Sequence, residues 1–291
     1  MPRLLREPLR TPASPGIARV SELYYQVLRR FPHLNRLYAP AVPAVSPYAP
    51  VDRTSIEIVS HCWRYATLLT YQLSSLVRNP PRDTVVTMTV FHAAEDDATC
   101  RVLEYFGRQQ VPNVLWNWRP LTLPNLMRRA IGRNLAALES DADWVFFTDC
   151  DVLFGEGVLD RLGRMLVGRD EVLFYPGRHL VTPLLPGDHP MFTVPYDTVV
   201  EVPEYDWIPD VRDRATGPFQ ITRGDVARAL GYCGTTGYFQ RPAARWRKAR
   251  EDCVFRWLLG TQGTPLEIEG FYRIRHKAKG RKGATFEDSA A

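Results

Sequence analysis

The segment IGRNLAALESDADWVFFTDCDVLF (131–154) gives the clearest indication of the fold. Its first half has helical spacing, and its second half is an apolar strand, WVFF, that ends at Asp149-Cys150-Asp151. Two acids at alternate positions of an extended backbone point the same way, and they repel each other unless a cation lies between them. Carboxylate oxygens suit Mg²⁺ or Mn²⁺ on a diphosphate, rather than zinc or copper. The segment therefore predicts a buried strand that ends in two metal-binding carboxylates.

The sequence around this segment alternates between strands and helices. Strands are expected at 55–60, 83–91, 113–118, 143–149 and 171–177. Helices are expected at 65–77, 97–110, 124–140 and 157–167. Strands separated by helices of this length predict right-handed crossovers and a largely parallel sheet with helices on both faces. The predicted fold class is therefore α/β.

The second half of the chain has a different pattern. Residues 178–216 are rich in loops, and they are followed by helices near 221–232 and 250–262 and by a strand at 266–276. Ligands of open α/β sheets bind beyond the carboxyl ends of the strands. We therefore expect a nucleotide on the first half of the chain and a second substrate on the irregular second half.

Composition is that of an ordinary soluble globular protein, with 45% hydrophobic and 24% charged residues among 291. No apolar run approaches the roughly 20 residues of a transmembrane helix, and the N-terminus MPRLLREPLRTPASPG lacks the apolar core of a secretory signal. The five cysteines form no C-x-x-C pair, which indicates neither a disulfide framework nor a zinc site. These features predict a cytoplasmic protein.

The net charge of +5 suits an anionic partner, which could be nucleic acid, a membrane surface or a diphosphate ligand. The sequence contains no RNP, zinc-finger or helix-turn-helix pattern, so nucleic acid is not expected. Near the N-terminus, the stretch 18–31 places Val20, Tyr24, Val27, Leu28 and Phe31 at helical spacing. We expect this amphipathic helix to pack on its own domain; contact with a membrane or a second subunit is the alternative.

A helix with Arg133-Asn134 is followed by an apolar strand and then by the Asp149-Cys150-Asp151 motif. In this order of elements the chain resembles the GT-A glycosyltransferases, particularly the large bacterial family 2. The resemblance covers about residues 55–280. It implies a GT-A fold, a Rossmann-like, mostly parallel sheet with an irregular acceptor side. It also implies that Asp149 helps to hold the ribose and the metal, that Asp151 ligates the metal on the sugar diphosphate, and that Arg133 lies near the donor.

The segment IVSHCWRYATLLTYQLSSL (58–76) is similar to the family's first strand, polar turn and first helix, where the nucleobase docks. The resemblance makes His61 and Arg64 candidates for contacts with the base and the phosphates, although His61 could equally be a helix-cap residue. Many relatives end the second strand with an aspartate that reads uracil, whereas this chain has His92 at about that point. Both UDP and GDP sugars therefore stay candidate donors.

Two later segments resemble the acceptor side of the family. GPFQITRGDV (217–226) is similar to the loop that lines the donor sugar and the acceptor, which implies roles for Gly217, Phe219 and Gln220. RKAREDCVFRWLLG (247–260) is similar to the Glu-Asp pair over the acceptor in inverting members, with Asp252 as general base and Glu251 beside it. The alternative for this pair is a helix N-terminal acid pair that the helix dipole stabilises.

The segment EGFYRIRHKAKGRK (269–282) ends a strand with a histidine and a basic run. Several metal-dependent GT-A families use a histidine near this point as a third metal ligand, which implies that role for His276. The following Lys277 and Lys279 would then approach the diphosphate.

We therefore expect four parts: a proline-rich N-terminal arm (1–54), a nucleotide-sugar-binding half (55–177), an acceptor-binding half (178–276) and a basic, flexible tail (277–291). The predicted function is metal-dependent transfer of a sugar from a nucleoside-diphosphate donor to a hydroxyl of a saccharide or other acceptor, with inversion. One alternative is a nucleotidyltransferase, which needs a glycine-rich loop where SHCWRYAT has no glycine. Another is a non-catalytic protein that binds sugar or nucleic acid. Peripheral membrane contact and oligomerisation through the arm stay open.

Overall fold

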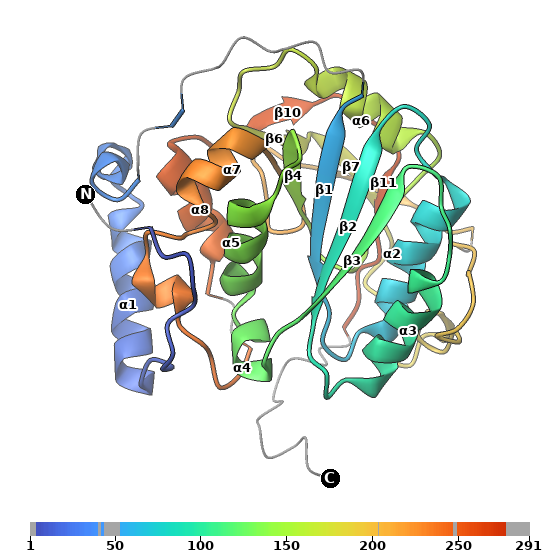
Figure 1. The fold of residues 1–291 in the computed structure, drawn as a ribbon, viewed down its shortest axis with the longest axis horizontal. Helices are drawn as coiled ribbons and strands as arrows, with labels where there is room; N and C mark the ends of the chain where they lie inside the picture. The colour runs from blue at the N-terminus through green and yellow to red at the C-terminus, as the bar shows by residue number, and fades with distance from the viewer. Residues whose placement is uncertain (1–3, 40–41, 44–52, 203, 247–248, 278–291) are drawn as a thin grey trace.

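The computed structural model describes residues 4–39, 42–43, 53–202, 204–246 and 249–277, and its central layer is a seven-stranded sheet (Figure 1). The strands are β1 (Ser55–His61), β2 (Val85–His92), β3 (Val114–Pro120), β4 (Trp144–Phe147), β5 (Val152–Phe154), β6 (Leu173–Pro176), β7 (Arg178–Val181), β8 (Ile208–Val211), β9 (Gln220–Arg223), β10 (Thr264–Leu266) and β11 (Phe271–Arg273). The α-helices are α1 (Pro15–Leu28), α2 (Ala66–Arg78), α3 (Asp97–Gly107), α4 (Leu123–Leu126), α5 (Arg129–Glu139), α6 (Val158–Leu166), α7 (Gly224–Leu230) and α8 (Glu251–Leu259). Three 3₁₀ helices are η1 (Pro32–Leu37), η2 (Pro190–Phe192) and η3 (Gly237–Gln240).

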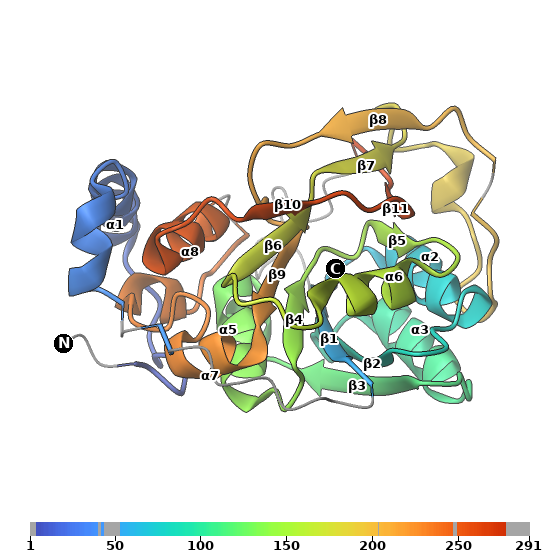
Figure 2. The same cartoon turned by 90° about the horizontal axis from the view of Figure 1, so that it is seen from above.

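The main sheet has the strand order β10-β6-β9-β4-β1-β2-β3. Strands β4, β1, β2 and β3 pair in parallel, as do β10 and β6, whereas β9 is antiparallel to both of its neighbours. Figure 2 shows α2, α3 and α6 on one side of this sheet and α5, α7 and α8 on the other. The predicted α/β class, with a mostly parallel sheet flanked by helices, is confirmed.

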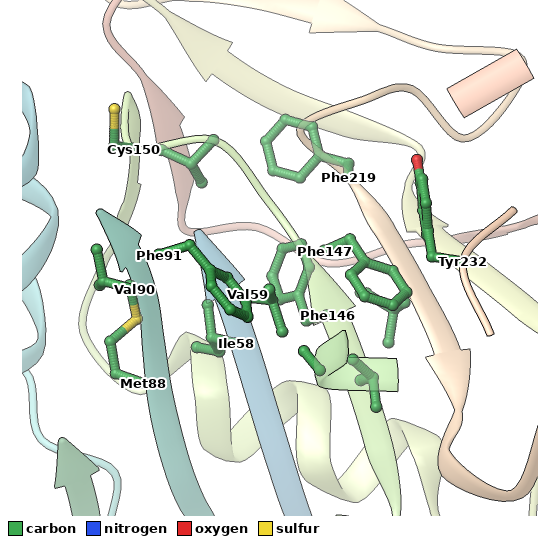
Figure 3. Close-up of a cluster of buried hydrophobic side chains, with 14 of the residues drawn as sticks. Ile58, Val59, Met88, Val90, Phe91, Phe146, Phe147, Cys150, Phe219 and Tyr232 are labelled. Carbon is green, nitrogen blue, oxygen red and sulfur yellow. The ribbon is translucent and has the colours of Figure 1, made fainter. Parts of the chain in front are cut away.

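Strand β4 lies at the centre of the sheet, and all four of its residues are buried. On one face Phe146 packs against Phe219 with their ring centroids 6.3 Å apart, and on the other Phe147 packs against Tyr232 at 4.7 Å (Figure 3). Alternate side chains of a strand point to opposite faces, so a strand that is covered on both faces is apolar throughout. Removing each of these rings from water stabilises the fold by about 2–3 kcal/mol.

A second sheet, in the order β5-β11-β7-β8, packs against α2 through β5. The sequence predicts loops over 178–216, yet this region supplies β7 and β8. Strand β8 reads IPDV and is largely exposed, so it lacks the apolar alternation from which a strand is recognised. Most of the region is irregular, as expected, and the strand β8, which the sequence does not indicate, forms through its pairing with β7 rather than through a buried face.

Three expected elements are divided in the structure. The helix expected at 221–232 begins as β9, because β-branched Ile221 and Thr222 favour the extended backbone that bridges β4 and β6. The strand expected at 266–276 is split into β10 and β11 around Gly270, whose φ of 105° suits glycine. The helix expected at 124–140 is split into α4 and α5 at Arg128, where φ is −112°.

The N-terminal helix exists but packs through a different face from the one expected. Helix α1 starts at Pro15 behind Ser14, whose side chain accepts a hydrogen bond from the Ile17 N–H at 3.4 Å. It contacts the rest of the protein through Tyr25, whose ring lies 5.3 Å from that of Phe239. The expected contact face is wrong: apart from Leu28, which is half-buried, its members Val20, Tyr24, Val27 and Phe31 are exposed.

In the described ranges, no helix is long and apolar enough to cross a membrane. The predicted basic tail falls outside the described residues from position 278 onward, and Lys279 with it. The stretch 44–52 of the proline-rich arm also lies outside them.

Candidate functional site

The chain reverses its direction of travel across the sheet between β1 and β4. From β1 it moves outward through β2 to β3, and it then returns to the other side of β1 as β4. In open α/β sheets, ligands bind outside the carboxyl ends of the strands at such a reversal. Two turns leave the sheet there, 62–65 after β1 and 148–151 after β4, so the Asp149-Cys150-Asp151 motif lies where a ligand is expected.

The Asp149-Cys150-Asp151 motif forms a tight turn. The Val152 N–H donates to the Asp149 carbonyl at 3.2 Å, so the extended backbone expected here is wrong: the chain turns as it passes from β4 in the main sheet to β5 in the second sheet. The side-chain amide of Gln72, from α2, donates to the carbonyls of Asp149 at 2.9 Å and Val152 at 3.0 Å. Gln72 therefore fixes the turn, and nothing in the spacing of the sequence indicates this role.

The Asp149 carboxylate is held by two arginines of α5. Arg129 donates to Oδ1 at 2.7 Å and Arg133 to the same oxygen at 3.3 Å. The Nε of Arg129 lies 3.8 Å from Oε1 of Glu251, at the start of α8. Burial by itself lowers the pKa of Arg129, but Asp149 and Glu251 outweigh it and raise the pKa. Arg129 thus stays charged between two acids, and sequence reasoning missed it.

The Asp151 carboxylate is held from the opposite direction, by β11. The Nε of Arg273 donates to its Oδ2 at 3.0 Å. Burial opposes the charge on Arg273, whereas Asp151 and then Asp149 raise its pKa. Three acids and three arginines therefore meet at the carboxyl end of β4. We call this set the carboxylate–arginine cluster; its members are Arg129, Arg133, Asp149, Asp151, Glu251 and Arg273.

The cluster retains acceptor oxygens that could bind a cation. Asp151 is buried, and its Oδ1 accepts no hydrogen bond from any residue that the structure describes. A buried carboxylate oxygen in this state is costly unless a donor or a cation reaches it. The carboxylates of Asp149 and Asp151 therefore fit an oxygen-preferring ion such as Mg²⁺ or Mn²⁺.

His276 lies three residues beyond the end of β11, which runs beside the same turn. The Ile274 N–H donates to the Asp151 carbonyl at 2.9 Å, so the strand runs beside the motif. The buried imidazole packs edge-on to Tyr65, with the rings 5.1 Å apart. Among the described residues, no three His, Cys, Asp or Glu side chains lie close enough together to hold a metal. His276 as a third ligand therefore stays a prediction.

A hydrogen-bonded chain joins the motif to the second half of the protein. The guanidinium of Arg133 donates to the Tyr232 hydroxyl at 2.9 Å and to the Gly217 carbonyl at 2.9 Å. The Tyr232 hydroxyl donates to Oε1 of Gln220 at 2.7 Å, and the Gln220 amide donates to the Asp252 carbonyl at 3.3 Å. One hydrogen-bonded network therefore contains four candidate residues from the sequence, which are Arg133, Gly217, Gln220 and Asp252. It also contains Tyr232, which the sequence does not single out.

The burial of these groups shows what they do in this structure. The side chains of Arg133 and Gln220 are fully buried. Both therefore support the site through hydrogen bonds to its other residues. Phe219 lies in the core near Phe146 (Figure 3), and its ring centroid lies 4.5 Å from that of His179. Contact of Phe219 or Gln220 with a sugar stays a prediction, and the Gly217 backbone lies nearer the surface.

The two acids at the start of α8 differ in their surroundings. Glu251 is buried with its carboxylate toward Arg129. Asp252 is half-buried, with Oδ2 3.8 Å from the Cys253 thiol, and no arginine or lysine of the described chain lies within ion-pair distance of it. Asp252 is therefore the acid of this pair whose carboxylate is available to accept a proton.

The residues expected to hold the nucleotide fall into two groups. His61 is buried, with its ring stacked on Phe91 at 5.1 Å and packed against Gly132 of α5, where a Cβ would come within 2.3 Å of Nε2. His61 is therefore an interior residue in this structure. Arg64 follows β1, His92 is the last residue of β2, and both lie nearer the solvent.

Arg64 has the left-handed φ of 56°, and its N–H donates to the Asp96 carboxylate at 2.6 Å. This bond ties the turn after β1 to the start of α3. Burial lowers the pKa of His92, which favours a neutral imidazole at neutral pH. The exposed Lys277 follows His276. The nucleotide-binding roles of Arg64, His92 and Lys277 stay predictions.

A cavity of about 920 Å³ lies at the other ends of the strands, between α6 and the segments that lead into β2 and β3. Its lining includes Arg82, Asn113 and Asp160. The Asp160 carboxylate accepts the backbone N–H groups of Arg82, Asp83 and Thr84, which lowers its pKa although burial alone would raise it. Since α/β sheets bind ligands at the carboxyl ends of their strands, we assign this cavity no part in the site.

Replacing Arg133 with methionine should destabilise the protein by about 3–5 kcal/mol, because it removes buried hydrogen bonds and one cation of the cluster. Arg164→Met is the control, since Arg164 makes an exposed ion pair with Asp83 at 3.3 Å and such pairs contribute about 1 kcal/mol or less. Urea unfolding measures both. Equal losses in the two variants would show that the Arg133 network does not organise the fold.

His179 on β7 should make stability depend on pH. Burial lowers its pKa from 6.5 to about 4, although Asp210 partly opposes this. The unfolded chain therefore binds more protons between these two values, and stability should fall by up to about 3 kcal/mol as the pH drops from 6.5 to 4. Unfolding across this range, compared with His179→Gln, checks it: the variant should show a shallower slope, and identical slopes would contradict the prediction.

No known family model matches the chain, and no curated protein is significantly similar to it. Among solved structures it is similar to S. aureus TarS 1–349, with a TM-score of 0.46 and 12% identity, and to the same fragment in complex with UDP, with 0.47 and 12%. It is also similar to a longer S. aureus TarS structure, with 0.48 and 14%. Each comparison covers 76% of this chain, but only 60%, 60% and 37% of the TarS chains. At these scores the likeness carries no conclusion about activity.

Proposed function

We propose that this protein transfers a sugar from a nucleoside-diphosphate donor to an acceptor hydroxyl. The observation that carries the proposal is the position of the Asp149-Cys150-Asp151 turn, at the carboxyl end of β4 where the strand order reverses. That place suits a nucleotide, and carboxylates beside buried arginines suit a diphosphate with its cation. Residues 55–177 would bind the donor, and residues 178–276 the acceptor.

The metal in this proposal is Mn²⁺ or Mg²⁺, held by Asp149 and Asp151, with His276 as a proposed third ligand. Bound there, it would neutralise the charge that develops on the departing diphosphate. Arg129 and Arg273 orient the two carboxylates through their ion pairs. Lys277 and Lys279 would add charge close to the phosphates, and Arg64 and His92 would contact the nucleoside.

Asp252 is the proposed general base. It lies at the start of α8 and is joined through its backbone to Gln220 and Tyr232 and so to Arg133. A base must lie within hydrogen-bond reach of the acceptor hydroxyl; of the two acids of α8, Asp252 is half-buried, whereas Glu251 is buried beside Arg129. Direct attack assisted by one base inverts the configuration of the sugar.

The proposal is tested by measuring thermal unfolding with UDP, GDP, CDP and dTDP sugars, each with and without Mn²⁺ or Mg²⁺. Binding to the native state raises the midpoint by mass action, so one nucleotide class should raise it in the presence of metal. Free nucleosides at the same concentration are the control, because they lack the diphosphate. If none of the sugar nucleotides shifts the midpoint, the proposed function is wrong.

A further inference from the structure

Helix α1 and η1 expose large apolar side chains in unusual density. Seven of the thirteen exposed large apolar residues of the described chain fall between positions 17 and 37. Five of them lie on α1 and the sixth lies two residues after its C-terminal cap; they are Ile17, Val20, Leu23, Tyr24, Val27 and Phe31. We call these six residues the α1 face. Soluble proteins expose single apolar residues commonly, but a contiguous group of this kind marks an interaction surface.

The protein does not need the α1 face to fold. The opposite side of the helix makes the internal contacts, through buried Ala18, the Tyr25 ring against Phe239, and Glu22, which accepts a hydrogen bond from the Tyr238 hydroxyl at 2.7 Å. Since each residue turns the helix by roughly 100°, the exposed apolar side chains cover about a third of its circumference. Figure 2 places α1 at one end of the molecule, with α8 between it and the main sheet.

The segment that carries this face is rich in arginine and poor in acids. Arg19 is exposed one turn before Leu23, Arg30 is exposed just beyond the end of α1, and Arg36 is exposed on η1. Residues 4–39 contain two acids, Glu7 and Glu22, and the Glu22 carboxylate already accepts the bond from Tyr238. A segment that is apolar on one helix face and rich in arginine suits the boundary between lipid headgroups and acyl chains, where guanidinium groups meet phosphates.

We propose that the α1 face docks the protein on the surface of a membrane that contains anionic lipids. The charge favours this occupant over a second copy of the chain, because a symmetric contact between two α1 faces would bring the same arginines together. Attraction of a basic segment to an anionic leaflet raises the partition constant roughly fivefold for each arginine at the surface. Docking is independent of sugar transfer, so either proposal can fail without the other.

Docking would also orient the acceptor half of the protein. The Trp257 indole N–H of α8 donates to the Phe31 carbonyl at 3.1 Å, and its ring lies 5.4 Å from that of Tyr38. The helix that carries Asp252 is thus attached directly to the membrane-facing segment. An acceptor carried by the membrane surface would then lie near α8, a consequence that rests on the proposed function.

The test is sedimentation of the full chain with phosphatidylcholine vesicles, with and without phosphatidylglycerol. We expect at least tenfold stronger partition to the anionic vesicles, reduced by salt. The variant Val20→Gln/Leu23→Gln/Val27→Gln should lower the partition at least tenfold, and Arg19→Gln/Arg30→Gln should lower it by a comparable factor. All five positions are exposed or outside the core, so both variants should fold normally and keep the thermal shift with the sugar nucleotide.

The matched control is Leu115→Gln/Val211→Gln, which removes exposed apolar side chains from β3 and β8 and should leave the partition unchanged. The proposal is overturned if the wild type binds neither vesicle, or if the triple variant binds as the wild type does. A third outcome also overturns it: light scattering shows that the wild type is a dimer and the triple variant a monomer, and the wild type does not bind vesicles. The α1 face would then join two copies of the chain.

Discussion

Replacing Asp151 with asparagine is expected to abolish the metal-dependent binding of a nucleoside-diphosphate sugar. The substitution keeps the shape of the side chain and removes the charge that would bind the cation. Loss of a residue that only supports a metal ligand costs roughly 10–100-fold in affinity, so loss of the ligand itself should cost roughly 100-fold or more. Equilibrium dialysis with labelled donor, with and without Mn²⁺, measures the change.

The same substitution should also affect stability, because Asp151 is buried and pairs with Arg273 at 3.0 Å. Removing one partner of a buried pair leaves the other charge uncompensated, and asparagine can still accept a hydrogen bond, so we expect a cost of about 1–3 kcal/mol. Circular dichroism therefore accompanies the binding measurement, to show that the variant is folded. Asp213→Asn is the control: Asp213 pairs with Arg214 on the surface. If folded Asp151→Asn protein binds donor and metal as the wild type does, Asp151 is not a ligand.

Replacing Asp252 with asparagine is expected to reduce turnover by roughly 10²–10⁴-fold and to leave donor affinity unchanged. The reason is that the substitution removes a proton acceptor, while the carbonyl that accepts from Gln220 stays in place. Release of nucleoside diphosphate in the presence of acceptor measures turnover.

Glu251→Gln provides the comparison for this experiment. Glu251 is buried beside Arg129, so its loss should destabilise the protein and weaken donor binding through the carboxylate–arginine cluster. Normal turnover in Asp252→Asn would move the base elsewhere. A product anomer that retains the donor configuration, determined by NMR, would rule out inversion with a single base.

Parallel strands were the most predictable part of the fold. The strand at β4 is apolar at each position because helices and the second sheet cover both of its faces, and this property is local to the sequence. Strand β9 was harder to predict: Ile221 and Thr222 favour an extended backbone, but this four-residue segment directly precedes a helix, and it is identified as a strand by its pairing with β4 and β6. Its assignment depends on partners that are distant in the chain.

The site shows the same division. Asp149 and Asp151 could be found because they directly follow a buried strand. Arg129 and Gln72 could not, because their partners Asp149 and Glu251 are brought to them only by folding. The apolar side of α1 was expected to pack on the protein, and that expectation was wrong because burial also depends on partners that are distant in the chain. Helical spacing shows that apolar side chains share a face, but it does not show whether the protein itself or an outside surface covers that face.

The central claim is that the turn at Asp149-Cys150-Asp151 binds a nucleoside-diphosphate sugar together with a divalent metal. Isothermal titration calorimetry of the wild-type chain with the sugar nucleotide selected by thermal unfolding tests it most directly, with Mn²⁺ present in one titration and removed by chelation in the other. We predict one binding site per chain and an affinity at least tenfold higher with Mn²⁺. Equal affinity in the two titrations, or no binding in either, would contradict the account.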